Sequence, residues 1–169
     1  LLKKWYGPLF GDAFRYIVGV QFRNCATIGG SIYPRFGFSD VLTSLMLTDT
    51  TVKLYRAGTL PLETFLQLPG KKDILEKVMI KKEKWQTSYL AQRKSAVDFP
   101  VVSVAVGRSG RKWRIVAGAR PGRAKRAVNT AKLLDLNPDE EQVRAAGRAI
   151  TEEITLGSDA RGGKAFRQT

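Results

Sequence analysis

The chain has 169 residues, 43% of them hydrophobic, and carries a formal net charge of +14. This length and composition predict one or two folded cores rather than a disordered chain. The absence of histidine and the single cysteine, Cys25, exclude a Ser-His triad, a four-cysteine iron–sulfur cluster and an internal disulfide.

The first half of the chain predicts alternating helices and strands. Apolar residues in 11–18 have helical spacing and stop at Gly19, whereas proline and glycine make 32–38 irregular. The segments expected next are a helix capped by Ser39 or Asp40, a strand over 51–55, a turn at Gly58, a short helix from Pro61, and strands over 74–80 and 85–91.

The second half predicts a hairpin followed by two helices. Strands over 101–106 and 113–119 flank a glycine-containing turn at 107–110. A helix is expected over 123–134, and a second one is capped by Asn137 and packs through one apolar stripe. The stripe consists of Val143, Ala146, Ile150 and Ile154. The whole order predicts an α+β fold in two units. Residues 1–92 form a mixed sheet with flanking helices, and residues 93–169 form a small antiparallel sheet with helices.

A glycine pair gives the strongest functional signal in the sequence. The stretch reads Thr27, Ile28, Gly29, Gly30 and Ser31. Because glycine lacks a Cβ, its N–H group can approach phosphate oxygens closely. We therefore expect Gly29 and Gly30 in a loop with at least one positive φ that faces an open cleft. An ordinary turn is the alternative interpretation.

The positive charge gathers in two clusters. These are Lys71, Lys72, Lys77, Lys81, Lys82 and Lys84, and then Arg108, Arg111, Lys112, Arg114, Arg120, Arg123, Lys125 and Arg126. Clustered cations suit nucleic acid, because binding releases counterions. These residues interleave with strand-like apolar residues, which favours solvated faces or a surface for an acidic partner over nucleic acid.

Location follows from the same composition. No apolar run is long enough to span a membrane, and nothing at the start resembles a signal peptide. We therefore expect a cytoplasmic protein that does not bind membranes, with Cys25 as a small buried hydrophobe. Because the chain begins at Leu1 in mid-pattern and without a methionine, we also expect it to be a fragment or a processed product.

Beyond the glycine pair, nearly the whole chain resembles the flavin subunit of molybdenum hydroxylases, such as xanthine dehydrogenase and carbon monoxide dehydrogenase. Residues 21–31 resemble the second flavin motif of that family, and Ser39-Asp40 resembles its loop ending in a cofactor-contacting aspartate. Asp73-Ile74-Leu75 resembles the loop whose aliphatic residue packs near the isoalloxazine. Further similar segments are the junction with Arg93 and Asp98, residues 118–121 and residues 159–167.

The resemblance implies FAD as the cofactor, with no catalytic residue and no metal ligand on this chain. The implied FAD-binding residues are Thr27, Ile28, Gly29, Gly30, Ser31, Ser39, Asp40 and Leu75. It also implies two partners, a molybdopterin-binding large subunit and a 2Fe-2S subunit. Electrons would pass from the iron–sulfur clusters through FAD to NAD or another acceptor, so the chain would be an oxidoreductase component that is inactive alone.

The chain departs from the family pattern in several ways. The first FAD motif of the family, an Ala-Gly-Gly-Thr-like loop, has no counterpart here. We therefore expect this chain alone to be colourless, and to expose an apolar patch near Phe14 and Ile17. Ser31 stands where many relatives carry Asn or Asp. Arg35 is bulkier than the residues common in its loop, and could contact a phosphate or reach solvent.

Two other functions fit the residues. The first is a basic module that binds nucleic acid or an acidic protein without a cofactor. The second is a structural fragment that only docks to partner subunits.

Overall fold

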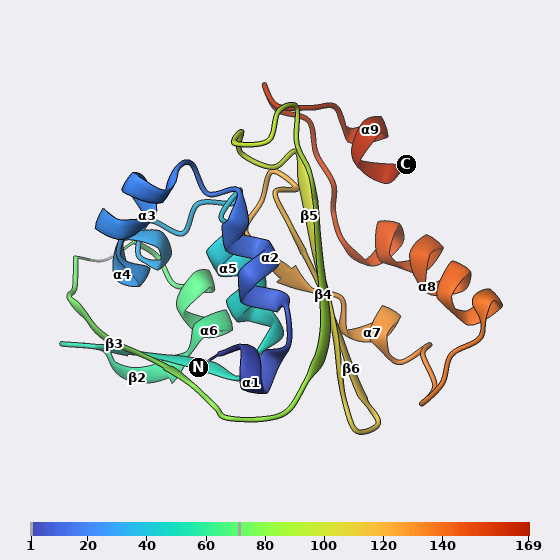
Figure 1. The fold of residues 1–169 in the computed structure, drawn as a ribbon, viewed down its shortest axis with the longest axis horizontal. Helices are drawn as coiled ribbons and strands as arrows, with labels where there is room; N and C mark the ends of the chain where they lie inside the picture. Colours follow the sequence, from blue (N-terminus) through green and yellow to red (C-terminus); the bar gives the residue numbers. More distant parts are fainter. Residues whose placement is uncertain (1, 71) are drawn as a thin grey trace.

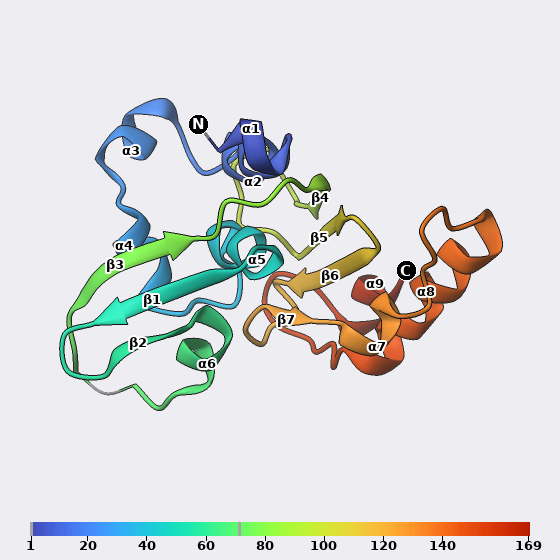
Figure 2. The same ribbon diagram turned by 90° about the horizontal axis from the view of Figure 1, so that it is seen from below.

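The computed structural model describes residues 2–70 and 72–169 and contains two antiparallel sheets, with helices around and between them (Figures 1 and 2). Leu1 and Lys71, the latter a member of the first basic cluster, lie outside the described residues. The N-terminal elements are α1 (Lys3–Tyr6), α2 (Leu9–Arg15), α3 (Val20–Cys25), α4 (Ile28–Ile32), α5 (Asp40–Leu47), β1 (Thr50–Leu54), β2 (Gly58–Pro61), α6 (Leu62–Gln67) and β3 (Leu75–Ile80). The C-terminal elements are β4 (Gln86–Gln92), β5 (Val102–Ser109), β6 (Lys112–Gly118), β7 (Lys125–Arg126), α7 (Val128–Ala131), α8 (Glu140–Glu153) and α9 (Lys164–Gln168).

The first sheet has three antiparallel strands in the order β2-β1-β3. Its central strand alternates buried and half-buried residues, as the sequence of β1 predicts, and places Val52 and Leu54 in the core. Gly58, with a φ of +72°, makes the turn expected after β1. Residues Gly58–Pro61 then form strand β2, which was not predicted from the sequence.

The second sheet has four antiparallel strands in the order β4-β5-β6-β7. The β5–β6 hairpin closes at the pair Ser109 and Lys112, so its turn contains only Gly110 and Arg111. Gly110 supplies the positive φ of +56° that a two-residue hairpin turn of this kind requires. The predicted hairpin is confirmed, with the turn two residues beyond the centre of the expected one.

Helix α5 lies between the two sheets, as Figure 2 shows. All eight of its residues are buried, polar ones included, and the Ser39 hydroxyl caps it by accepting from Leu42 N at 3.2 Å. Its last carbonyl groups are bound by arginines from the second sheet. Arg114 donates to Leu47 O at 2.9 Å, and Arg126 donates to Met46 O at 2.7 Å. The second sheet thus satisfies polar backbone atoms at the buried end of α5.

The far face of the second sheet forms a smaller core with the C-terminal helices. Ile115 and Ala117 of β6 pack there against Ile154 and Leu156 at the end of α8. Of the predicted stripe on α8, Ala146 and Ile154 are buried, whereas Val143 is 52% exposed. The helix is capped by Asp139, two residues later than predicted, because its carboxylate accepts from Gln142 N at 2.8 Å.

A buried arginine fixes the C-terminal segment. The Arg167 side chain is fully buried and donates to Val101 O, Gly157 O and Gly162 O, at 2.8, 2.6 and 2.5 Å. It also forms an ion pair with Asp159. Partial burial alone would raise the pKa of Asp159, but hydrogen bonds from Arg161 and Arg167 outweigh it and hold that pKa well below its ordinary value.

The helix predicted over 123–134 is wrong. Residues 125 and 126 instead form β7, whose pairing with Val116 and Ala117 extends the second sheet. Only Val128–Ala131 are helical in this stretch. The sequence of this stretch has helical periodicity, but residues 125 and 126 pair with β6 instead. The pairing also places the Arg126 guanidinium at the end of α5.

The helix predicted over 11–18 runs instead over Leu9–Arg15. Val18 has a φ of +47°, which is unfavourable for a β-branched residue and ends any helix. The Arg23 guanidinium stabilises the turn that follows α2, because its Nη1 donates to Ile17 O and Val18 O, both at 3.0 Å.

The division at residues 92 and 93 remains a prediction. Strand β4 pairs along its whole length with β5, and Trp85 and Tyr89 belong to the same core as α2 and α5. No helix among the described residues is long and apolar enough to cross a membrane.

The contact between α5 and β6 leaves no room for a side chain at Gly118. A Cβ there would overlap Thr43 Oγ1 of α5 and lie 2.7 Å from Ser103 Oγ. We expect Gly118→Ala to lower the free energy of unfolding by about 3 kcal/mol, measured by urea denaturation.

Gly147→Ala in α8 is the matched control, since nothing lies within 4 Å of its Cβ position. It should raise the free energy of unfolding by up to about 1 kcal/mol, because alanine favours the helix. Equal effects of the two substitutions would contradict this packing of α5.

Candidate functional site

The glycine pair lies in a short helix, so the predicted loop with a positive φ is wrong. Thr27 is the N-cap of α4, and its Oγ1 accepts from Gly30 N at 3.0 Å. Among the described glycines only Gly7, Gly58 and Gly110 have a positive φ. The hydroxyl that begins the motif therefore closes a helical turn, which the sequence interpretation did not anticipate.

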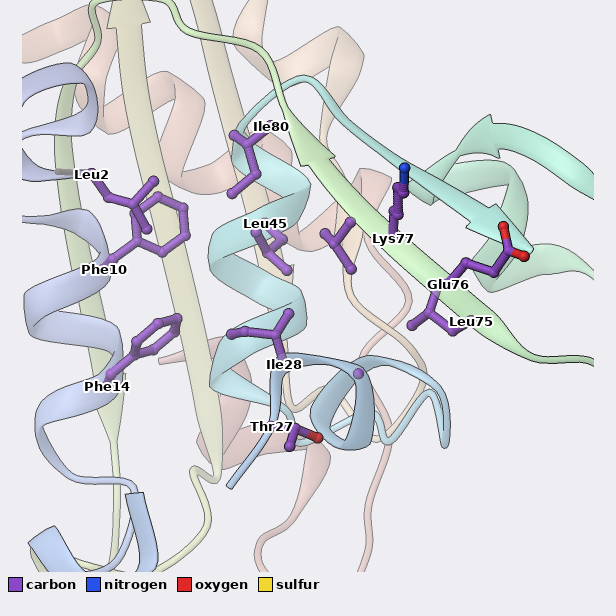
Figure 3. Close-up of a pocket in the computed structure, with 12 residues that line it drawn as sticks. Leu2, Phe10, Phe14, Thr27, Ile28, Leu45, Leu75, Glu76, Lys77 and Ile80 are labelled. Atoms are coloured by element: carbon purple, nitrogen blue, oxygen red, sulfur yellow. The ribbon is translucent and has the colours of Figure 1, made fainter. Parts of the chain in front are cut away.

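Part of the motif lines an apolar cavity of about 440 Å³ between α2, α4 and β3 (Figure 3). We call it the α4–β3 cavity. Figure 3 shows Phe10 and Phe14 on one side and Ile28 and Leu75 on the other. The other lining residues are Leu2, Thr27, Gly29, Leu45, Glu76, Lys77, Val78 and Ile80. Four of the predicted site residues, Thr27, Ile28, Gly29 and Leu75, thus come together here.

Gly29 keeps the gap between α4 and β3 open. A Cβ on Gly29 would lie 3.9 Å from Leu75 Cδ2, in ordinary van der Waals contact. A larger side chain would therefore extend into the cavity rather than disturb the helix. Gly30 is tighter, since its Cβ would lie 3.1 Å from Thr27 Oγ1.

The remaining predicted residues, Gly30, Ser31, Ser39 and Asp40, line a second cavity of about 260 Å³, the Asp40 cavity. The other residues that line it are Tyr16, Ile17, Val18, Phe22, Phe36, Phe38, Val41, Arg93, Val97, Asp98 and Phe99. Helix α4 contributes to both cavities, with Gly29 in the α4–β3 cavity and Gly30 and Ser31 beside Asp40 in the second. The two serine hydroxyls bind local backbone, since Ser31 Oγ donates to Thr27 O and Ser39 Oγ caps α5.

Asp40 is buried and tied to the second sheet. Its Oδ1 accepts from Tyr89 OH and from Arg93 Nη2, both at 2.5 Å. Burial raises the pKa of Asp40 above its ordinary value, and the hydrogen bonds from Tyr89 and Arg93 oppose that rise. Burial and the neighbouring carboxylate raise the pKa of Tyr89, which therefore acts as a neutral donor.

Arg93, which the sequence interpretation placed only at a domain junction, lines the Asp40 cavity. Its side chain is 7% exposed, and Nη1 donates to Asp98 O at 2.7 Å. Its Nε is buried and has no hydrogen-bond partner in the described part of the chain. Beside the ion pair with Asp40, Arg93 therefore keeps one buried donor without an acceptor among the described residues.

Two sequence expectations for single residues are resolved by the structure. Arg35 neither reaches solvent freely nor lines either cavity, because its guanidinium lies 4.1 Å from the Phe65 ring centroid and donates to Leu68 O. Cys25 is exposed, so its predicted burial is wrong.

The predicted apolar patch is confirmed. Large hydrophobic residues are exposed around α3 and the start of α4. They are Tyr16, Val18, Val20, Phe22 and Ile28. Among the described residues, no group of three or more Asp, Glu or Cys could hold a metal ion.

Comparisons with known families match almost the entire chain. Residues 1–82 match the FAD binding domain in molybdopterin dehydrogenase, and residues 87–169 match the CO dehydrogenase flavoprotein C-terminal domain. The chain belongs to the flavin subunits of the molybdenum hydroxylases. FAD is the cofactor of that family. No individual curated protein matches the sequence closely enough to serve as a relative.

Solved structures show the same fold. A chain of carbon monoxide dehydrogenase from Hydrogenophaga pseudoflava superimposes with a TM-score of 0.85 at 21% identity, over 99% of this chain and 64% of that one. A chain of quinoline 2-oxidoreductase from Pseudomonas putida 86 gives a TM-score of 0.83 at 21% identity, over 95% of this chain and 61% of that one. A chain of reconstituted CO dehydrogenase from Oligotropha carboxidovorans gives a TM-score of 0.85 at 18% identity, over 99% of this chain and 64% of that one. The chain thus spans less than two thirds of these matched chains.

Replacing Arg93 should reveal how strongly the Asp40 cluster depends on its ion pair. Arg93→Met would leave the buried Asp40 carboxylate without its cation, so we expect the free energy of unfolding to fall by about 3 kcal/mol. Arg144→Met, which breaks an exposed pair with Glu140, should change it by less than about 0.5 kcal/mol. Urea denaturation measures both, and a small loss for Arg93→Met would show that the ion pair is dispensable.

Proposed function

We propose that this chain forms one wall of the FAD site in an oxidoreductase of the molybdenum hydroxylase type. The observation that carries the proposal is the meeting of Thr27, Ile28, Gly29 and Leu75 around one apolar cavity. When bound, FAD supplies the redox chemistry, and the protein supplies binding, orientation and exclusion of water.

The α4–β3 cavity fits the apolar part of such a cofactor. Leu75 and Ile28 offer aliphatic faces, and the missing side chain of Gly29 keeps the space between them open. Cofactor sites have this composition, apolar walls with a few polar groups at the rim. Thr27, Glu76 and Lys77 provide those polar groups here.

The Asp40 cavity fits the oxygen-rich part. Arg93 and Asp40 both line this cavity, so it offers a cation and a carboxylate to the polar groups of a ligand. Asp40 is suited to accept from a ribityl or ribose hydroxyl, whereas a phosphate would be repelled by its charge. Gly30, Ser31 and Ser39 complete this part of the proposed FAD site.

The other wall of the site belongs, in this proposal, to the portion of the matched chains that this chain does not span. A dinucleotide bound by one wall loses a large share of its contacts. We therefore expect the described chain alone to hold FAD only weakly and to be colourless after purification.

The proposed electron path needs centres on other chains. This chain has no histidine and one cysteine, so it cannot itself supply the ligands of a 2Fe-2S cluster. A molybdopterin-binding large subunit and a 2Fe-2S subunit would deliver electrons to FAD, and NAD or another acceptor would remove them. The cytoplasm is the proposed location of this complex.

Filling the α4–β3 cavity tests the proposal. In Gly29→Leu a side chain would occupy the space facing Leu75, so FAD affinity should fall at least about tenfold. Equilibrium dialysis of FAD against the purified protein, with FAD quantified by its absorbance, measures the change.

Gly147→Leu adds the same side chain to an exposed helix position with nothing within 4 Å. It should leave FAD affinity unchanged. Equal affinities of the native chain and Gly29→Leu would exclude this cavity as the cofactor site. Tight stoichiometric binding by the native chain would show that the second wall is not required.

A further inference from the structure

Half of the net charge of the protein gathers at one end of the molecule. Three segments meet there, α1, the connection 81–85 and the tip of the β5–β6 hairpin, along the lower edge of Figure 1. We call this surface the basic end. Its cationic residues are Lys3, Lys4, Lys81, Lys82, Lys84, Arg108, Arg111 and Lys112. With Glu83 as its one acidic residue, the basic end has eight positive charges against one negative, a net +7 of the total +14.

Hydrogen bonds hold the three segments together as one surface. Trp85 N donates to Trp5 O at 2.8 Å, and Thr87 Oγ1 donates to Tyr6 O at 2.5 Å. The hairpin joins them through Ser109 Oγ, which donates to Glu83 Oε1 at 3.2 Å. The charges are therefore displayed on fixed backbone rather than on independent loops.

The lysines of the basic end and Arg111 are available for a partner, whereas the Arg108 guanidinium already donates to Gln86 Oε1 and Leu136 O. None of the eight takes part in an ion pair within the described chain, and all except the half-buried Arg108 are exposed. Lys3, Lys4, Lys84 and Arg108 surround a recess of about 480 Å³ that shares no lining residue with the two proposed cofactor cavities. A ligand in this recess would leave both cavities accessible.

The aromatic residues distinguish between the possible polyanions. Lys4 Nζ lies 5.6 Å from the centroid of Trp5, and the guanidinium groups of Arg108 and Arg114 lie 5.8 and 4.9 Å from Trp113 and Trp85. Proteins that bind single-stranded nucleic acid stack bases on free aromatic faces. Here a cation of the protein already lies over each of these rings and Trp85 is buried, which favours the exposed lysine ammonium groups over base stacking as the binding groups.

We propose that the basic end is the docking surface for an acidic protein surface, recognised by the lysines of α1 and of the connection 81–85. The charge of the basic end is complementary to clustered Asp and Glu, and such complementarity steers association and fixes orientation. This surface is independent of FAD binding, so it stands whether or not the cofactor site is correctly assigned.

A charge-reversal pair tests the proposal. K3E/K4E/K84E reverses three lysines around the recess, and K132E/R148E/K164E applies the same change in charge to exposed cations elsewhere. Fluorescein-labelled octaglutamate is the probe, and fluorescence anisotropy measures its affinity at two salt concentrations. An eight-nucleotide thymidine oligomer serves as the competing polyanion.

The native protein should bind octaglutamate more tightly than the oligonucleotide, with affinity that falls as salt rises. K3E/K4E/K84E should weaken peptide binding at least about tenfold, whereas K132E/R148E/K164E should change it by less than about threefold. Equal losses in both variants, or no binding by the native protein, would overturn the proposal. Tighter binding of the oligonucleotide would assign the surface to nucleic acid instead.

Discussion

The burial of α5 between the two sheets is the constraint on which the rest of the structure depends. A helix with every residue buried cannot leave its terminal backbone groups to water, so other elements must satisfy them. Ser39 does this at the start, and Arg114 and Arg126 from the second sheet do it at the end. Positive side chains at a helix C-terminus also stabilise the helix, because they interact favourably with the negative end of its dipole. The two sheets therefore depend on one shared helix.

The same helix positions the candidate site. Asp40, its first residue, is bound by Tyr89 and Arg93 of the second sheet and its following segment, while α4 packs against α5 from the other side. The cavities on the two sides of the site thus depend on contacts between residues far apart in sequence. A change in the second sheet that displaces Tyr89 or Arg93 would alter the Asp40 cavity, whose lining also includes Gly30 and Ser31 of the glycine motif.

Much of the α+β fold, the β5–β6 hairpin included, was predictable because alternation in β1 and the glycine turns are local signals, whereas strand β2 was missed. The helix expected at 123–134 failed because β7 is specified by pairing with β6, which no local pattern records. At the candidate site, the sequence singled out residues 27–31 but did not reveal Thr27 as a helix cap. Arg93 could not be ranked above its neighbours, since only its packing against Asp40 distinguishes it.

Native-state hydrogen exchange with increasing urea tests most directly whether α5 makes the two sheets one cooperative unit. If it does, the slowest amides of β1, α5 and β5 should exchange with one common free energy of opening and one dependence on urea. A lower free energy for the β2-β1-β3 sheet, with its own dependence on urea, would contradict the account, because that sheet would then open while α5 stays packed on β6.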